Sequence, residues 1–191
     1  DQKIKEKPPK SVFLYGAGCN ATTILNFITN GKYEYNNQIN QIKPHDWGLT
    51  VFFHYFMDSI NFGFNKDNIK EVIQLRINNH KLRAEEKLRE LNNIEYNIAN
   101  AIISGTINKE VQDIVNDTIK NQQDSIEDLS CRPICQYVEN KVFILHGAND
   151  NMIPFTESIQ LNTLIPKSEL LISFLFEHKG VASKRSIFFK L

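Results

Sequence analysis

The chain has few cysteines, no excess of charge of either sign and no long hydrophobic run. Its three cysteines, Cys19, Cys131 and Cys135, are too few and odd in number for a disulfide-stabilised scaffold. Lysine and arginine (22) balance aspartate and glutamate (22). We therefore expect no nucleic-acid partner, because nucleic-acid surfaces need a basic excess. No apolar run approaches the roughly 18–20 residues that a membrane-spanning helix needs, so we expect no transmembrane segment.

Recognisable metal and cofactor motifs are also missing. Cys131 and Cys135 could form half of a zinc site, but zinc usually binds four ligands in two pairs, and no second pair is visible. The turn at 16–21 lacks the third glycine of the dinucleotide fingerprint and the Lys-Ser/Thr of a Walker loop. The sequence therefore predicts no metal site and no cofactor.

Length and composition indicate one folded domain. Of the 191 residues, 41% are hydrophobic, which is enough to build a substantial core. Residues 1–10 contain no apolar signal-peptide segment. A chain that opens on Asp1 is compatible with a mature or truncated product, so this absence says little about the parent protein. The sequence does not define a compartment, although a cytoplasmic one is favoured.

Strand patterns stand near both ends of the chain, at 11–15, 142–145 and 170–176. Strands that alternate with helices predict an α/β fold with a parallel sheet and crossover helices. Residues 45–129 have helical apolar spacing and are too many for one crossover. We therefore predict a partial α/β core from residues 1–44 and 130–191, with residues 45–129 inserted as a helical cap over the strand ends.

Several individual elements are expected. Apolar spacing predicts a helix at 45–62, a long helical region at 67–104 and a helix that begins after Asn108. Cys131 to Cys135 is expected to be a loop. The last elements are a helix at 156–164 capped by Thr156, and a final helix at 183–191.

Three strand ends carry features that suit nucleophilic hydrolysis. The run from Val142 ends in a loop with Asp150, and the run at 170–176 ends at His178. An Asp and a His from successive strand ends form the supporting pair of a nucleophilic hydrolase site. The first strand leads through a tight turn at 16–20 into a helix, which is the arrangement of a nucleophile elbow. This turn contains no serine.

This order of elbow, helical insertion, Asp loop and His loop resembles the α/β-hydrolase family. Residues 141–179 resemble the penultimate strand and acid loop of its bacterial esterase- and lipase-like members. The resemblance implies that Asp150 is the triad acid and His178 the triad base. It also implies an ester or acyl hydrolase that admits a small apolar substrate under the cap.

The elbow departs from the family's Gly-x-Ser-x-Gly pattern. In one register Gly16 is the first glycine, and Gly18 stands where the serine belongs, which removes the nucleophile. In a register shifted by one, Cys19 is the nucleophile and the amide of Asn20 helps to hold the oxyanion. The first register is favoured, because elbow geometry tolerates little sliding.

Two principal functions therefore remain open. One is an ester hydrolase that uses Cys19, and the other is an inactive relative that acts as a binding or scaffold protein. A third reading is a helical interaction module based on residues 67–121. The family also places three or four strands before the elbow, whereas only ten residues precede strand 11–15 here. We expect the parent chain to supply this missing N-terminal part of the fold.

Overall fold

The computed structural model describes residues 9–177 and 180–181. Its strands are β1 (Ser11–Tyr15), β2 (Lys32–Tyr35), β3 (Gln38–Gln41), β4 (Lys141–Gly147), β5 (Ser168–Ser173), β6 (Phe176–Glu177) and β7 (Gly180–Val181). Its α-helices are α2 (Ala21–Asn30), α3 (Trp47–Phe56), α4 (Asp67–Ile77), α5 (Lys81–Arg89), α6 (Asn93–Ser104), α7 (Lys109–Asn121), α8 (Gln123–Glu127) and α9 (Phe155–Leu164). A 3₁₀ helix, η1, spans Arg132–Tyr137.

The central sheet is parallel and has the strand order β1-β4-β5. Tyr15 pairs with Leu145, and Gly147 pairs with Ser173, so the carboxyl ends of the three strands meet at one edge. The chain crosses from β1 to β4 through the helices and from β4 to β5 through α9. The predicted α/β fold, with a parallel sheet, crossover helices and a helical insertion, is confirmed.

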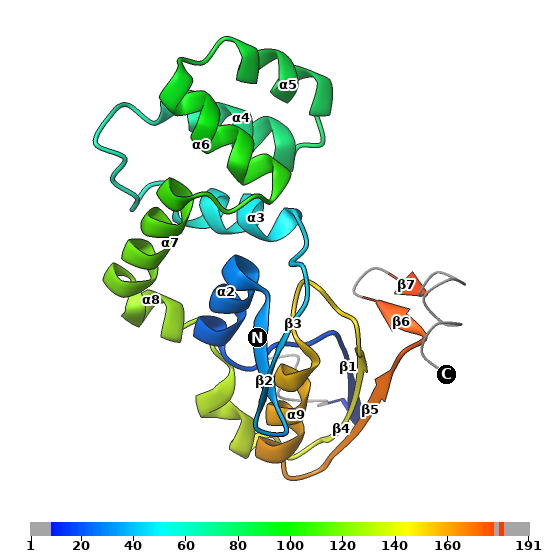
Figure 1. The fold of residues 1–191 in the computed structure, drawn as a ribbon. Helices are drawn as coiled ribbons and strands as arrows, with labels where there is room; N and C mark the ends of the chain where they lie inside the picture. Colours follow the sequence, from blue (N-terminus) through cyan, green and yellow to red (C-terminus); the bar gives the residue numbers. More distant parts are fainter. Residues whose placement is uncertain (1–8, 178–179, 182–191) are drawn as a thin grey trace.

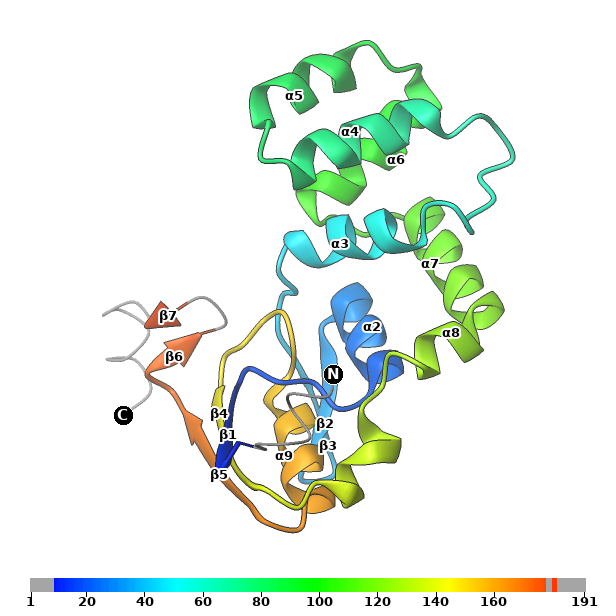
Figure 2. The same cartoon turned by 180° about the vertical axis from the view of Figure 1, so that it is seen from behind.

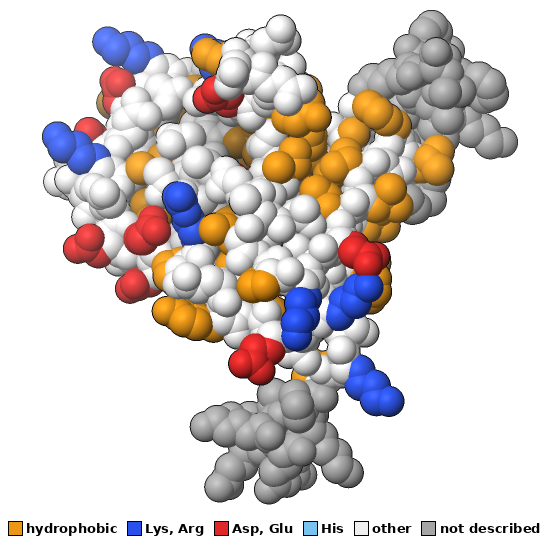
Figure 3. Space-filling view, turned by 90° about the horizontal axis from the view of Figure 1, so that it is seen from below, with side chains coloured by type: hydrophobic (Ala, Val, Ile, Leu, Met, Phe, Trp, Pro, Cys, Tyr) orange, Lys and Arg blue, Asp and Glu red, His pale blue; other side chains and the backbone are white. Residues whose placement is uncertain are grey.

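One face of this sheet is covered and the other is exposed. Val142, Ile144 and His146 alternate along β4 on the buried face, where α9 packs. On the other face Phe13 is 64% exposed and Leu171 is 61% exposed. Figure 3 shows hydrophobic side chains along the side of the molecule on which the sheet lies in Figure 1. This exposure is unusual, because parallel sheets are normally covered on both faces.

The described residues form two hydrophobic cores. The larger core lies among the helices α3 to α8, and the smaller one lies between the sheet, η1 and α9. Helix α2 lies between these parts and contacts α3, α7 and α8 (Figures 1 and 2). The turn that precedes α2 is therefore supported by both cores.

Residues 45–129 form more and shorter helices than their apolar periodicity predicts. The expected helical region at 67–104 is three helices, because Asn79 adopts a left-handed conformation with φ of 61° and Asn92 begins a new helix with a capping box. The helix expected at 45–62 is shorter, since α3 spans Trp47–Phe56. Asn108 caps α7 as predicted, with its side chain accepting the amide of Val111. None of the described helices combines the length and apolar character needed to cross a bilayer.

Three expectations near the sheet are corrected. The Cys131–Cys135 segment, expected as a loop, lies largely in η1. Helix α9 begins at Phe155 after Pro154, so Thr156 lies inside the helix and does not cap it. The strand expected at 170–176 is β5, which ends at Ser173, followed by a turn. The helix expected at 183–191 lies outside the described residues.

Candidate functional site

The turn between β1 and α2 begins at a glycine in a left-handed conformation. Gly16 has a φ of 57°, and its amide donates to Leu145 O on β4 at 3.0 Å. Gly18 and Cys19 do not adopt this conformation. Asn20 caps α2, with its side chain accepting the amide of Thr23 at 3.2 Å. The left-handed backbone conformation therefore lies two residues before the position that matches the family's serine.

Glu157, in the first turn of α9, accepts hydrogen bonds from the backbone of this turn. One carboxylate oxygen, Oε2, accepts the amides of Cys19 at 3.0 Å and Asn20 at 2.8 Å. The other oxygen accepts the hydroxyl of Thr23 at 2.5 Å. Glu157 is buried, and a buried carboxylate needs hydrogen bonds to compensate for the loss of water. The donors at the N-terminus of α2 supply these charge-assisted hydrogen bonds. The amide of Asn20, which the sequence suggests as an oxyanion donor, thus has an internal acceptor.

Cys19 is 1% exposed and lies beside the two other cysteines. Burial, together with the neighbouring Cys131, Cys135 and Glu157, raises the pKa of its thiol to about 12. A cysteine nucleophile needs the opposite, a pKa lowered toward neutrality in an accessible position. At neutral pH the side chain of Cys19 is therefore a buried thiol.

The position of Gly18 is closely packed. A Cβ atom built there would lie 2.4 Å from Ile24 Cδ1 and 3.9 Å from Ile153 Cδ1. The first contact is closer than van der Waals distance, so a side chain at Gly18 requires the end of Ile24 to move. The second contact places the loop after β4 directly beside the turn. The space that a serine would use is filled by Ile24.

Asp150 lies in the loop after β4 and is 2% exposed. Its Oδ1 accepts the amides of Met152 at 2.8 Å and Ile153 at 3.0 Å, which fixes the loop. Its Oδ2 lies 3.5 Å from Nε2 of His146, at the end of β4. A buried carboxylate held by backbone amides is suited to orienting an imidazole or to stabilising the loop itself.

His146 connects the Asp150 loop to the turn after β1. Its Nε2 lies 3.0 Å from Ile153 O and must carry a proton there, because a carbonyl only accepts. Its Nδ1 lies 2.6 Å from Ser158 Oγ, and Ser158 Oγ lies 3.2 Å from Ala17 O. The ring is fully buried. The network joins both strand ends to α9.

The structure therefore brings part of the predicted site together. Gly16, Gly18, Cys19 and Asn20 lie in one turn, and the Asp150 loop packs against that turn through Ile153. His178 lies outside the described residues, so its assignment as the base stays a prediction.

Glu157 and Ser158 were not predicted as site residues. The signal for Glu157 is present in the sequence, because Glu157 and Leu161 on α9, and Ile165 directly after it, are spaced by four and are all buried. Such spacing predicts that a side chain faces inward. It does not reveal that the partners of Glu157 are two amides more than a hundred residues earlier in the chain.

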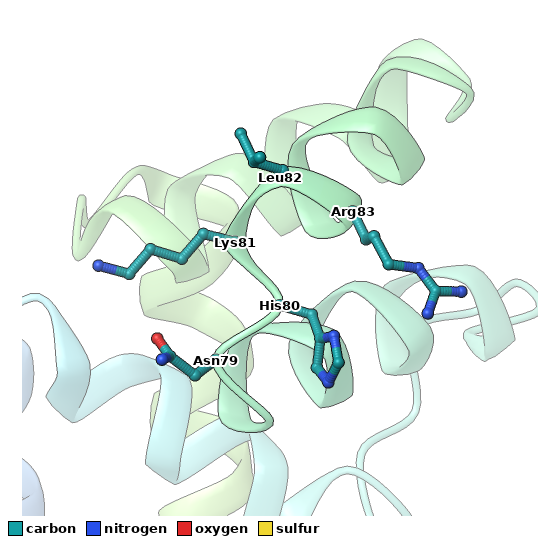
Figure 4. A pocket seen from close by; sticks show the side chains of 5 residues that line it. All are labelled: Asn79, His80, Lys81, Leu82 and Arg83. Atoms are coloured by element: carbon teal, nitrogen blue, oxygen red, sulfur yellow. The ribbon is translucent and has the colours of Figure 1, made fainter.

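An apolar cavity of about 300 Å³ lies beside the turn. It is lined by residues of β1, the turn, η1, β4 and α9, among them Leu14, Gly18, Cys131, Val138 and Val142. Its volume is at the lower end of the range of small-molecule sites. A larger hollow lies at the turn between α4 and α5, but Figure 4 shows that its side chains, from Asn79 to Arg83, point away from one another. A further hollow, lined by Asn20, Thr23, Arg132 and residues of α9, also adjoins the turn, so the apolar cavity is distinguished by its lining and not by its position.

Comparisons with known proteins found likeness at the level of structure alone. No protein-family model matches the chain, and no characterised protein matches it in sequence. An α/β-fold hydrolase from Bacillus anthracis str. Sterne has a TM-score of 0.38 and 14% identity, covering 88% of this chain and 52% of that one. An acetylester hydrolase from Corynebacterium glutamicum has a TM-score of 0.31 and 14% identity, covering 95% and 58%. The chain thus spans about half the length of these two solved structures.

A third similar structure is the 2-hydroxy-6-oxo-6-phenylhexa-2,4-dienoate hydrolase of Rhodococcus sp. strain RHA1. Its TM-score is 0.28 and its identity 13%, with 89% of this chain and 83% of that chain covered. All three solved structures are named as hydrolases.

Proposed function

We propose that this chain is a non-catalytic, α/β-hydrolase-like protein that binds a small apolar compound without hydrolysing it. The observation that carries the proposal is the position of Glu157. In this family the amide of the residue after the nucleophile helps to hold the oxyanion. That residue is Cys19 if Gly18 stands for the serine, and Asn20 if Cys19 is the nucleophile. Glu157 Oε2 accepts both of these amides.

A carboxylate at this place opposes ester hydrolysis. The tetrahedral intermediate of acyl transfer carries a negative oxygen that needs these amides as donors, and losing one such donor costs about 10²–10³ in rate. Glu157 holds the amides with a negative charge of its own, which would also repel the oxyanion. The burial and raised pKa of Cys19 and the absence of a side chain at Gly18 support the same function.

The ligand is suggested by the cavity beside the turn. Its walls are almost entirely apolar, with Leu14, Val138 and Val142 among them, so it suits a short acyl or other hydrocarbon group. The proposed ligand is therefore similar in chemistry to the substrate that the family resemblance implies. The exposed sheet face, with Phe13 and Leu171, supports a further part of the proposal, that additional polypeptide of the parent chain packs there.

A hydrolysis assay tests the first part of the proposal. We expect no turnover of short p-nitrophenyl esters by the wild-type chain, and none by Gly18→Ser, because Glu157 still holds both amides. Esterase activity in Gly18→Ser alone would contradict the blocking role of Glu157. If the wild type hydrolyses these esters and Cys19→Ala does not, the protein is an ester hydrolase with Cys19 as its nucleophile.

A binding assay tests the second part. A fluorescent short-chain acyl probe should bind the wild type, and Val138→Phe, which fills part of the cavity, should weaken binding. Tyr137→Phe is the matched control, because Tyr137 is the exposed neighbour and does not line the cavity. Equal binding by wild type and Val138→Phe would place the ligand elsewhere.

A further inference from the structure

All three cysteines of the chain converge on one point. Cys19 comes from the turn before α2, Cys131 directly precedes η1, and Cys135 lies within η1. Their Sγ atoms all lie within 4.8 Å of one another, and those of Cys131 and Cys135 are 3.8 Å apart. The turn that contains Cys19 and the segment from Cys131 to Cys135, more than a hundred residues apart in the sequence, are thus brought together by all three cysteines of the chain.

The 3.8 Å between the Cys131 and Cys135 sulfur atoms matches the spacing of ligands around a metal ion, and Cys19 Sγ lies within 4.8 Å of both. Thiolates bind zinc at about 2.3 Å, and tetrahedral geometry then separates the sulfur atoms by roughly 3.8 Å. A trigonal site with the same bond length separates them by roughly 4.0 Å. We propose that Cys19, Cys131 and Cys135 together bind one thiophilic closed-shell cation, Zn²⁺ or Cu⁺.

The electrostatics of the cluster are consistent with a cation at its centre. Cys19 and Cys135 are both buried, and burial disfavours closely spaced thiolates that have no cation between them. Glu157 adds negative charge, and only Arg132 opposes it at Cys19. Three thiolates therefore need a positive ion between them. Binding must release the thiol protons, so the apparent affinity should increase as the pH rises.

Without a metal the thiols make only weak hydrogen bonds. Cys131 Sγ lies 3.4 Å from Gly18 O, and Cys135 Sγ lies 3.2 Å from Cys131 O. These contacts hold the sulfur atoms near one another at little energetic gain, because S–H is a weak donor. A bound ion would replace them and would tie the turn after β1 to the helix η1 that precedes β4.

The number of ligands distinguishes the two ions. Among the described residues, the group of possible ligands contains these three cysteines and no histidine or carboxylate. Three soft sulfur donors can satisfy Cu⁺ as they stand, whereas Zn²⁺ needs a fourth ligand such as water. Cys131 and Cys135 also line the apolar cavity, which leaves room on that side for such a ligand.

The test uses the reduced chain, kept under argon with a phosphine reductant, which does not compete as a thiol would. Titration with Co²⁺ as a spectroscopic substitute for Zn²⁺ should produce sulfur-to-cobalt charge-transfer absorption that saturates at one ion per chain. Zn²⁺ should displace the Co²⁺. A parallel titration with Cu⁺ against a chromogenic chelator measures the second ion, and stronger retention of either one identifies it.

Cysteine variants test the ligand set. Cys19→Ser, Cys131→Ser and Cys135→Ser should each weaken binding by about 100-fold or more, because each removes one of three thiolates. Circular dichroism checks that each variant is folded. Gln136→Ala is the matched control, because Gln136 is an exposed residue of η1 next to Cys135 that does not line the cavity, and this variant should bind as the wild type does.

Three results would overturn the proposal. The first is a folded, reduced wild type that shows no charge-transfer band with Co²⁺ and retains neither Zn²⁺ nor Cu⁺ at micromolar concentrations. The second is binding that persists unchanged in Cys19→Ser, since the site would then not include the turn. The third is metal binding by the Cys19→Ser/Cys131→Ser/Cys135→Ser variant equal to that of the wild type.

Discussion

Glu157 and Asn20, 137 positions apart in the sequence, are joined by a hydrogen bond of 2.8 Å from the backbone amide to the carboxylate. The same oxygen also binds the amide of Cys19. This contact fixes the N-terminus of α2 to α9 and, under the proposed function, places a negative charge at the amides that an esterase would use as oxyanion donors. One side chain therefore both supports the fold and bears on the choice between catalysis and binding.

Glu157→Ala should lower the free energy of unfolding substantially. It leaves the amides of Cys19 and Asn20 and the hydroxyl of Thr23 without their acceptor. An unsatisfied buried donor costs about 1–3 kcal/mol, but Asn20 is only half-buried and Thr23 is exposed, so their donors can bind water instead. We expect a loss of about 2–5 kcal/mol in total, measured by urea unfolding. Glu169→Ala is the control, because it removes an exposed ion pair with Lys141 and should cost about 0–1 kcal/mol. Similar losses in both variants would contradict a special role for Glu157.

Ser158→Ala tests the network that joins the strand ends. It removes the hydroxyl that lies 2.6 Å from Nδ1 of His146 and 3.2 Å from Ala17 O and that donates its one proton to one of these two acceptors. We expect a loss of about 1–3 kcal/mol, because these groups are buried. Thr163→Ala, at an exposed position of the same helix, serves as control. If both variants unfold at the same urea concentration, the network adds nothing to stability.

The architecture could be predicted from the sequence because it depends on local patterns. Apolar runs defined β1 and β4, and the helical spacing of residues 45–129 defined an inserted helical segment. The boundaries were less accurate, because they depend on single residues such as Asn79, whose left-handed conformation divides the helical region. Asparagine tolerates this conformation, but periodicity does not show where it is used.

The candidate site was predicted as a set of positions and not as a set of contacts. The sequence placed Cys19 and Asn20 in one turn and Asp150 in another loop. It did not show that Glu157 binds the turn, nor that Cys131 and Cys135 lie beside Cys19, because both depend on how α9 and η1 pack on the sheet. Contacts of this kind follow from tertiary packing, which a single sequence does not specify.

The reactivity of Cys19 should be low in the metal-free protein. With a pKa of about 12, roughly one thiol in 10⁴ is ionised at pH 8, and only the thiolate reacts with iodoacetamide. Alkylation of Cys19 should therefore be about 10³-fold slower than that of an ordinary thiol. Mass spectrometry of timed samples measures the rate at each cysteine. Preferential modification of Cys19 would instead support a nucleophilic role.

The stability of the metal-free protein should fall at alkaline pH. Cys19 and Cys135 have pKa values of about 12 and 11 in the folded state, above the ordinary value of 9.0. The folded chain thus holds these protons more tightly than the unfolded chain does. The resulting stability is fully present below about pH 9 and is lost as the pH rises through about 11 and 12. Urea unfolding at about pH 8 and pH 10 should show a decrease that Cys19→Ala/Cys135→Ala lacks. An equal decrease in that variant would assign the effect to other groups.

The exposed sheet face should promote association of the isolated chain. Phe13 and Leu171 present large apolar side chains on a face that parallel sheets normally cover, so two chains can reduce their exposed area by pairing there. Phe13→Lys should lower the apparent mass in light scattering and reduce the fluorescence of a bound apolar dye. It should leave the unfolding midpoint nearly unchanged, because the side chain is already exposed. Ile39→Lys, at an exposed position on the β2–β3 hairpin, is the control and should change neither readout. A reduction that is equal in both variants would show that general surface charge, and not the sheet face, governs association.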